Sequence, residues 1–283
     1  MFSATTIITF IQRAILQGIP LLYGSTGEIL TEKSGNLNLG IPGIMYVGGI
    51  SGVIGAFLYE ESMGVNDLNP LLAVLIPLLC TILGSLLTGL IYCFLTVTLR
   101  ANQNVTGLAI TTFGVGFGNF FGGSISKLAG GVGQISVQTT AAFRAKIPGL
   151  SAIPVIGDLL FSYGFLTYLS VILAVCMTYF LKKTRRGLNL RAVGESPATA
   201  DAAGINVSKY KYIATVTGAA IAGLGGLYIL YIYLPGLTRA TQELCKMLPY
   251  VVTIIVLVIT SKRNKQENQP PASLGEAYFR EDR

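Results

Sequence analysis

The chain has 283 residues, of which 52% are hydrophobic and 12% charged, and its formal net charge is +7. Its mean hydropathy of +0.63 is too high for a soluble globular protein, and several apolar runs exceed the roughly 18 residues that suggest a membrane-spanning helix. The positive charge does not indicate nucleic-acid binding, because the cations lie in short loops beside apolar runs. The sequence therefore predicts an all-α, polytopic helical membrane protein with no soluble domain.

About seven apolar segments are expected to cross the membrane. The first is the least regular because it contains Arg13 and Glu28, whereas the apolar cores of the others contain no Asp, Glu, Lys, Arg or His. The third is expected to be tilted or broken near Pro77. Residues 1–260 should form the membrane domain, and residues 261–283 a flexible cytoplasmic tail. The expected spans are 5–30, 41–59, 70–99, 104–125, 159–181, 212–234 and 244–260.

The cations also set the expected orientation. Because positively charged loops remain in the cytoplasm, we expect the loop 182–211, Arg100 and the tail to lie inside the cell. The acidic loop at 60–67 and the polar connection 126–158 then lie outside. The N-terminus is also external if the first segment crosses once.

No constellation of catalytic or metal-binding residues is visible in the sequence. The four cysteines are scattered without CxxC spacing and the chain has no histidine, so neither a metal site nor a redox site is expected. The chain also lacks a Walker A motif, and its cleaner spans lack an ionisable relay. We therefore expect a transport protein rather than an enzyme, with no cofactor of its own and an energy source on another chain.

The most informative polar segment is the loop 182–211, whose first part is rich in lysine and arginine. Within it, Ser196 is a suitable N-cap, Pro197 suits the first helical position, and Gly204 suits the left-handed residue beyond the end of a helix. A helix of about seven residues is only about 10 Å long and marginal in isolation, so we expect it to dock against a partner. Its docking surface is expected to consist of Ala198, Ala200, Ala202 and Ala203.

Three stretches resemble a known family. RAVGESPATADAAGINVSKYKY (191–212), EKSGNLNLGIPG (32–43) and MLPYVVTIIVLVITSKR followed by PASLGEAYF are similar to bacterial ABC-transporter permeases. The similarity is greatest to the nucleoside permeases linked to basic membrane lipoproteins, relatives of the ribose and branched-chain amino acid permeases. In that family the first stretch inserts a short coupling helix into the ATP-binding subunit. The resemblance thus implies coupling roles for Arg191, Gly194, Glu195, Pro197, Ala203, Gly204 and Ile205.

The resemblance also implies a function and a set of partners. The chain is expected to be the permease subunit of an importer in the bacterial plasma membrane that moves nucleosides or related small polar solutes, with sugars and amino acids as further candidates. Its partners would be ATP-binding subunits that hold ATP and Mg²⁺, a second homologous permease chain, an extracytoplasmic solute-binding lipoprotein and membrane lipid. A stand-alone secondary transporter or channel is the alternative. A membrane-embedded enzyme is disfavoured, because no pair of carboxylates lies within a span.

The polar segment 25–43 has two interpretations. It forms either an interfacial loop or a broken helix beside a water-filled path, where irregular backbone is tolerated at membrane depth. Asparagine amides there offer both donors and acceptors to a polar solute. Where the family usually carries a glutamate between two glycines, this chain has Pro42, so no role of that carboxylate is carried over. The resemblance places Glu32, Gly35, Asn36, Asn38 and Gly40 beside the translocation path.

Glycines spaced four residues apart mark the segment 104–125. Gly114, Gly118 and Gly122 allow close approach of a neighbouring helix, and we prefer this packing role to direct contact with solute. Phenylalanines accompany these glycines; they either fill space between helices or stack on a nucleobase.

The resemblance fails between the last two expected spans. After IAGLGGLYIL the family continues through a re-entrant region and a further pair of membrane segments, whereas here a short bridge leads directly to MLPY. The sequence leaves two outcomes open, an inactive subunit or compensation by a neighbouring subunit.

Overall fold

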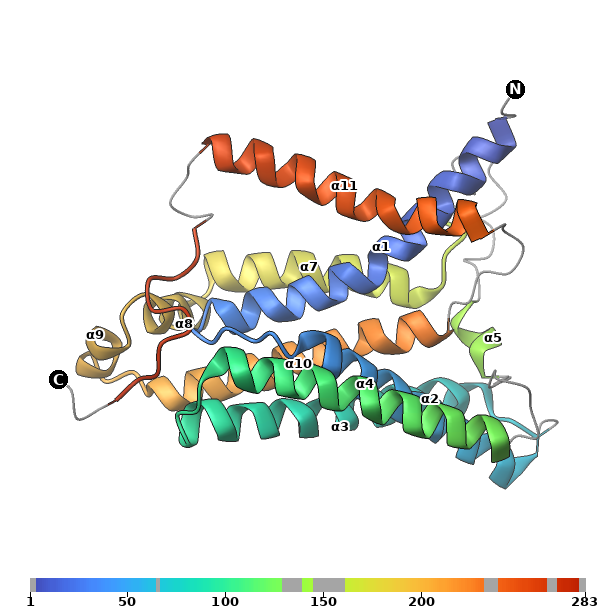
Figure 1. Cartoon of the computed structure of the whole chain (residues 1–283), viewed down its shortest axis with the longest axis horizontal. Helices are drawn as coiled ribbons and strands as arrows, with labels where there is room; N and C mark the ends of the chain where they lie inside the picture. Colours follow the sequence, from blue (N-terminus) through green and yellow to red (C-terminus); the bar gives the residue numbers. More distant parts are fainter. Residues whose placement is uncertain are drawn as a thin grey trace.

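The computed structural model describes residues 4–64, 67–128, 139–144, 161–231, 239–263 and 269–279. Within these residues every regular element is a helix, and the long helices run side by side along the longest axis of the molecule (Figure 1). The prediction of an all-α architecture is therefore confirmed. Residues 232–238 of the bridge between the last two spans and most of the connection 126–158 lie outside the described residues.

Each expected span corresponds to a long helix. Five of them are long and apolar enough to cross a membrane, namely α2, α3 together with its continuation η1, α4, α7 and α10. In α11 the apolar part is shorter, Pro249–Thr260, and α1 contains charged residues. The chain is thus a multi-pass membrane protein. The helices are α1 (Ala4–Glu32), α2 (Ile41–Met63), α3 (Pro70–Cys93), η1 (Phe94–Thr98), α4 (Gln103–Leu128), α7 (Phe165–Lys183), α10 (Val207–Tyr231) and α11 (Arg239–Arg263).

Local sequence explains where α3 begins and why it changes pitch. Asn69 caps the helix by accepting a hydrogen bond from Leu71 N at 3.0 Å, and Pro70 occupies the first helical position. The helix continues through Pro77, where we expected a tilt or break. The irregularity lies instead at η1, a π-helical turn at the other end. This turn leads into Arg100, whose φ is 57°.

The core is centred on α10, which contacts α1, α2 and α3. Its Leu227 and Tyr228 are fully enclosed, and small residues bring the neighbouring helices close. From α1, the Tyr23 hydroxyl donates to Leu166 O at 2.6 Å and so joins α7 to the same core. In contrast, α11 packs against α1 while its apolar side chains stay exposed, as lipid contact requires.

The two ends of the bundle differ. The end of α1, the helices α8 (Arg185–Glu195) and α9 (Pro197–Ala202) and the C-terminus gather at one end (Figure 1). The N-terminus and the short helix α5 (Thr140–Phe143) lie at the other end. The cation-rich segments therefore share one end, which is the arrangement that the positive-inside rule predicts for the cytoplasmic side.

Candidate functional site

The expected coupling loop folds as two short helices rather than one. Thr184 begins α8, because its Oγ1 accepts a hydrogen bond from Gly187 N at 3.0 Å. The second helix, α9, starts after Ser196 with Pro197 in the first turn, and Gly204 follows it with a φ of +83°. The predicted limits of the short helix are confirmed, although the Ser196 hydroxyl pairs with Thr199 Oγ1 at 2.8 Å and accepts no backbone hydrogen bond. The first helix, α8, was missed.

The alanine surface of α9 is divided between the inside and the outside of the molecule. Ala200 is buried in a small apolar cluster with Val193 and Val207. Ala198, Ala202 and Ala203 are exposed. Our expectation that all four alanines face a partner was therefore wrong for Ala200, which instead fastens α9 to its own chain.

Gly194 and Glu195 contact neighbouring segments of the same chain. Gly194 approaches the loop after α1 so closely that a Cβ on it would lie 2.5 Å from Lys33 O. Glu195 Oε2 accepts a hydrogen bond from Ala272 N at 3.2 Å, and its carbonyl accepts one from Ser273 Oγ at 3.3 Å. Arg191 and Ile205 are half-buried at the same end. These contacts tie α8 to two segments that are distant in sequence.

The C-terminal segment 269–279 crosses this end of the bundle. Its Gly275 N donates to Gly35 O at 3.1 Å, and Glu276 O accepts a hydrogen bond from Gln103 Nε2 at 3.4 Å. Tyr278 OH donates to Asp201 Oδ2 on α9 at 2.8 Å. We expected the tail from residue 261 onward to be flexible, whereas these eleven residues connect α9 with the loop after α1 and with the start of α4.

The loop 33–40 is a compact polar connection between α1 and α2. The first of these helices runs unbroken to Glu32, and the irregular backbone follows it. Asn36 and Asn38 are only 1% and 2% exposed. Asn36 Nδ2 donates to Thr215 Oγ1 at 3.1 Å, and Asn38 N donates to Glu28 Oε1 at 3.2 Å.

This loop also contains polar atoms without partners in the structure. Asn36 Oδ1, Asn38 Nδ2 and Glu28 Oε2 are buried without a hydrogen bond. Such atoms carry a free-energy cost, so a buried group of them is more common where function requires it. The asparagines and Glu28 come together here, while Glu32 is half-buried and Gly40 packs against Ile110. The place of the asparagines beside a solute path stays a prediction.

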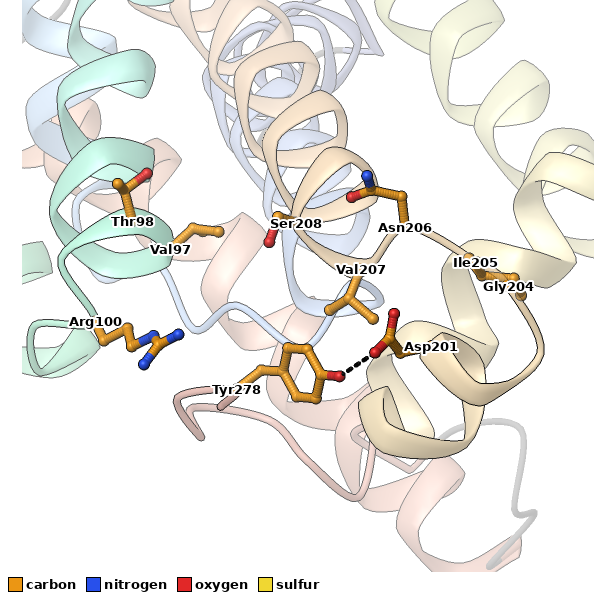
Figure 2. Close-up of a pocket in the computed structure, with 10 residues that line it drawn as sticks. All are labelled: Val97, Thr98, Arg100, Asp201, Gly204, Ile205, Asn206, Val207, Ser208 and Tyr278. Carbon is orange, nitrogen blue, oxygen red and sulfur yellow. Dashed lines mark hydrogen bonds between the residues drawn. The ribbon is translucent and has the colours of Figure 1, made fainter. Parts of the chain in front are cut away.

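A groove of about 550 Å³ lies beside the end of α9. Figure 2 shows Arg100 at one side and Asp201 at the other, with Tyr278 between them and hydrogen-bonded to Asp201. Gly204 and Ile205, two residues of the expected coupling set, also line the groove. The groove is therefore composed of three segments that lie far apart in the sequence.

Sequence reasoning missed three residues of this end. Lys211 was expected to be a loop cation, yet it belongs to α10 and is 3% exposed. Gln103 accepts from Leu37 N at 2.7 Å and donates to Glu276 O, so it links the loop 33–40 to the C-terminal segment. Tyr278 was part of the PASLGEAYF similarity, which was the one signal that pointed to a role for the tail. Within the described residues, no group of three or more His, Cys, Asp or Glu is arranged to hold a metal.

The fold and the polar end of the bundle together define a multi-pass helical protein whose cation-rich end is structured. Comparison with known families is specific: the profile of the "Branched-chain amino acid transport system / permease component" family matches residues 10–260. The chain belongs to this family. No solved structure matches the chain.

Several curated proteins are similar over most of the chain. The guanosine ABC transporter permease protein NupQ of Bacillus subtilis is 33% identical over 213 residues, which are 75% of this chain and 64% of the relative. The nucleoside ABC transporter permease protein NupC of Lactococcus lactis is 32% identical over 222 residues, 78% of this chain and 67% of the relative. A putative glucose ABC transporter permease protein, TsgC13 of Haloferax volcanii, is 30% identical over 223 residues, 77% of this chain and 62% of the relative. The matched region thus spans about two thirds of these relatives.

Proposed function

We propose that the chain is a permease subunit of an ATP-driven ABC importer for nucleosides or related small polar solutes. The family and the names of the two nucleoside and guanosine relatives support this assignment. A sugar is the next candidate, because a relative of similar identity is named as a putative glucose permease. ATP and Mg²⁺ would be held by separate ATP-binding subunits, and a second permease chain and a solute-binding lipoprotein would complete the transporter.

The observation that carries the proposal is the geometry of α9. Its exposed residues Ala198, Ala202 and Ala203 present a smooth surface at the end where the cations gather, and Ala200 anchors the helix from beneath. Because their side chains are small, another protein can approach the backbone of α9 closely. In this proposal the loop 182–211 is the coupling element, and residues 1–260 form the membrane domain.

The contacts of α8 suggest how force would pass into the membrane domain. Gly194 touches the backbone of Lys33, so a displacement of α8 would move the loop 33–40 directly. That loop is hydrogen-bonded through Asn36 to Thr215 of the central helix α10. Closure of ATP-loaded subunits on α9 would therefore reach α10 through a short series of packed groups, and the solute path would open to one side at a time.

Co-purification with an ATP-binding subunit tests the proposal. The tagged chain is co-expressed with a candidate second permease and a candidate ABC ATP-binding subunit from the same genome, and the complex is purified in mild detergent. We expect recovery of the ATP-binding subunit with the wild type. In Ala202→Trp the bulky ring should obstruct the docking face and lower affinity at least tenfold, a loss of about 1.4 kcal/mol.

A matched control separates docking from general damage. Ala141→Trp makes the same change at an exposed alanine of α5, at the opposite end of the bundle, and should leave recovery unchanged. Uptake of labelled guanosine by cells that produce the whole transporter should fall in Ala202→Trp and stay at the wild-type level in Ala141→Trp. Failure of the wild type to bind any ATP-binding subunit, together with guanosine flux through the purified chain alone in liposomes, would exclude the proposal.

A further inference from the structure

Arg100 has an unusual backbone conformation. Among the described residues it is the one non-glycine residue with a positive φ, 57°, and it lies exposed in the turn between η1 and α4. Residues other than glycine rarely adopt this backbone conformation, because their Cβ atom then lies too close to a carbonyl oxygen. A strained backbone that carries a long charged side chain suggests that the side chain itself has a function.

The guanidinium of Arg100 is held at the wall of the groove beside α9. Its Cζ lies 4.5 Å from the centroid of the Phe279 ring, a cation–π contact that fixes one face of the group. No carboxylate of the described residues forms an ion pair with it. Asp201 lies on the other side of the groove, where its carboxylate accepts a hydrogen bond from the Tyr278 hydroxyl (Figure 2). Arg100 thus presents hydrogen-bond donors to the groove without an acidic partner from the described chain.

We propose that Arg100 binds an acidic side chain of the ATP-binding subunit when that subunit docks on α9. Gly204 and Ile205, which follow α9, line the same groove, so a protein seated on the helix also covers Arg100. A carboxylate is the fitting group, because the planar guanidinium can donate two parallel hydrogen bonds to it. This inference rests on the proposed function. It extends the docking surface from a single helix to three segments, namely α9, the turn before α4 and the C-terminal segment.

The chain itself contains the competing acidic groups. Glu281 and Asp282 follow Phe279 in the sequence. The partner subunit is the occupant favoured here, because the groove adjoins the exposed face of α9 onto which that subunit would dock. The double variant Glu281→Gln, Asp282→Asn distinguishes the two sources of the carboxylate.

The test compares Arg100→Gly with a control that removes a cation elsewhere. Glycine relieves the backbone at a positive φ, so the fold should be retained while the guanidinium is lost. Lys262→Gln removes an exposed cation of α11, outside both the groove and the loop 182–211. The chain of 283 residues is placed in lipid nanodiscs, and the Kd for the ATP-binding subunit identified by co-purification is measured at low and high salt. We expect Arg100→Gly to raise Kd about tenfold or more and Lys262→Gln to raise it less than about threefold.

The outcomes separate this inference from the proposed function. A wild type without affinity for the ATP-binding subunit would overturn both. Wild-type binding that Arg100→Gly leaves unchanged, or that Lys262→Gln weakens equally, would overturn the inference alone. A tighter Kd for the Glu281→Gln, Asp282→Asn variant would mean that the chain's own carboxylates occupy Arg100, which also overturns it, whereas an unchanged Kd supports it.

Discussion

Gly114 of α4 lies directly against Gly43 of α2, and a Cβ built on Gly114 would overlap the Gly43 backbone. The contact is reciprocal along the helix pair, because a Cβ on Gly43 would overlap the backbone at Ile110 and Thr111. At this crossing the two backbones touch without intervening side chains. Small residues therefore set the distance between α2 and α4.

This crossing predicts that alanine substitutions at two glycines of α4 change the stability of the protein differently. Gly114→Ala should destabilise the protein by about 1–3 kcal/mol, because the added methyl group forces the helices apart. Gly116 has open space around its Cβ position, so Gly116→Ala should be neutral or stabilising by up to about 1 kcal/mol. Thermal unfolding in detergent, followed by circular dichroism, measures both. Equal effects of the two substitutions would contradict the packing at Gly114.

Periodicity and composition could predict the long helices. The apolar runs placed a helix at each expected span, and Pro197 located the start of α9, because its effect is local in sequence. The glycine spacing was also informative. Gly114 is at a close crossing as expected. In contrast, a Cβ added to Gly118 would lie 3.1 Å from the Tyr46 ring, and one added to Gly122 would only reach ordinary contact distance from Ile50.

The groove and the C-terminal segment could not be predicted in this way. Their contacts join residues that are far apart in sequence, such as Tyr278 with Asp201 and Gln103 with Glu276, and no local pattern encodes such pairs. The burial of Lys211 could not be predicted for the same reason. A lysine at the edge of an apolar run is ordinarily placed at the membrane surface. Here Lys211 Nζ lies close to Gly35 of the loop 33–40 and interacts electrostatically with Glu276 of the C-terminal segment, and both segments are distant in sequence.

The buried hydrogen bond between Asn36 and Thr215 gives a second prediction. Thr215→Val removes the acceptor of the Asn36 amide but keeps the size of the side chain, so the donor stays buried without a partner. We expect a loss of about 1–3 kcal/mol in the free energy of unfolding. Thr112→Val is the control, since Thr112 is exposed and its hydroxyl bonds only to Leu108 O of its own helix. A control that loses as much stability would argue against a specific role of the Asn36 contact.

The crossing of α1 and α10 gives a third prediction. A Cβ on Gly27 would overlap Gly218 O, and a Cβ on Gly218 would overlap Gly27 O. Gly27→Ala and Gly218→Ala should each lower stability by about 1–3 kcal/mol, and their combination should cost less than the sum because one displacement accommodates both methyl groups. Unfolding measurements on the single and double variants test this coupling. Strict additivity would show that the two glycines act independently.

Tyr278 gives the last prediction, on the attachment of the C-terminal segment to α9. Tyr278→Phe removes the hydroxyl that donates to Asp201 while it keeps the ring, and a hydrogen bond to a charged group contributes about 1.5–3 kcal/mol. We expect faster amide hydrogen exchange across 269–279 and little change in global unfolding, because α9 remains anchored by Ala200. Tyr250→Phe, at an exposed tyrosine of α11, should change neither quantity. Unaltered exchange in Tyr278→Phe would show that two backbone hydrogen bonds, from Ser273 N to Gly194 O at 3.2 Å and from Gly275 N to Gly35 O at 3.1 Å, hold the segment without the tyrosine.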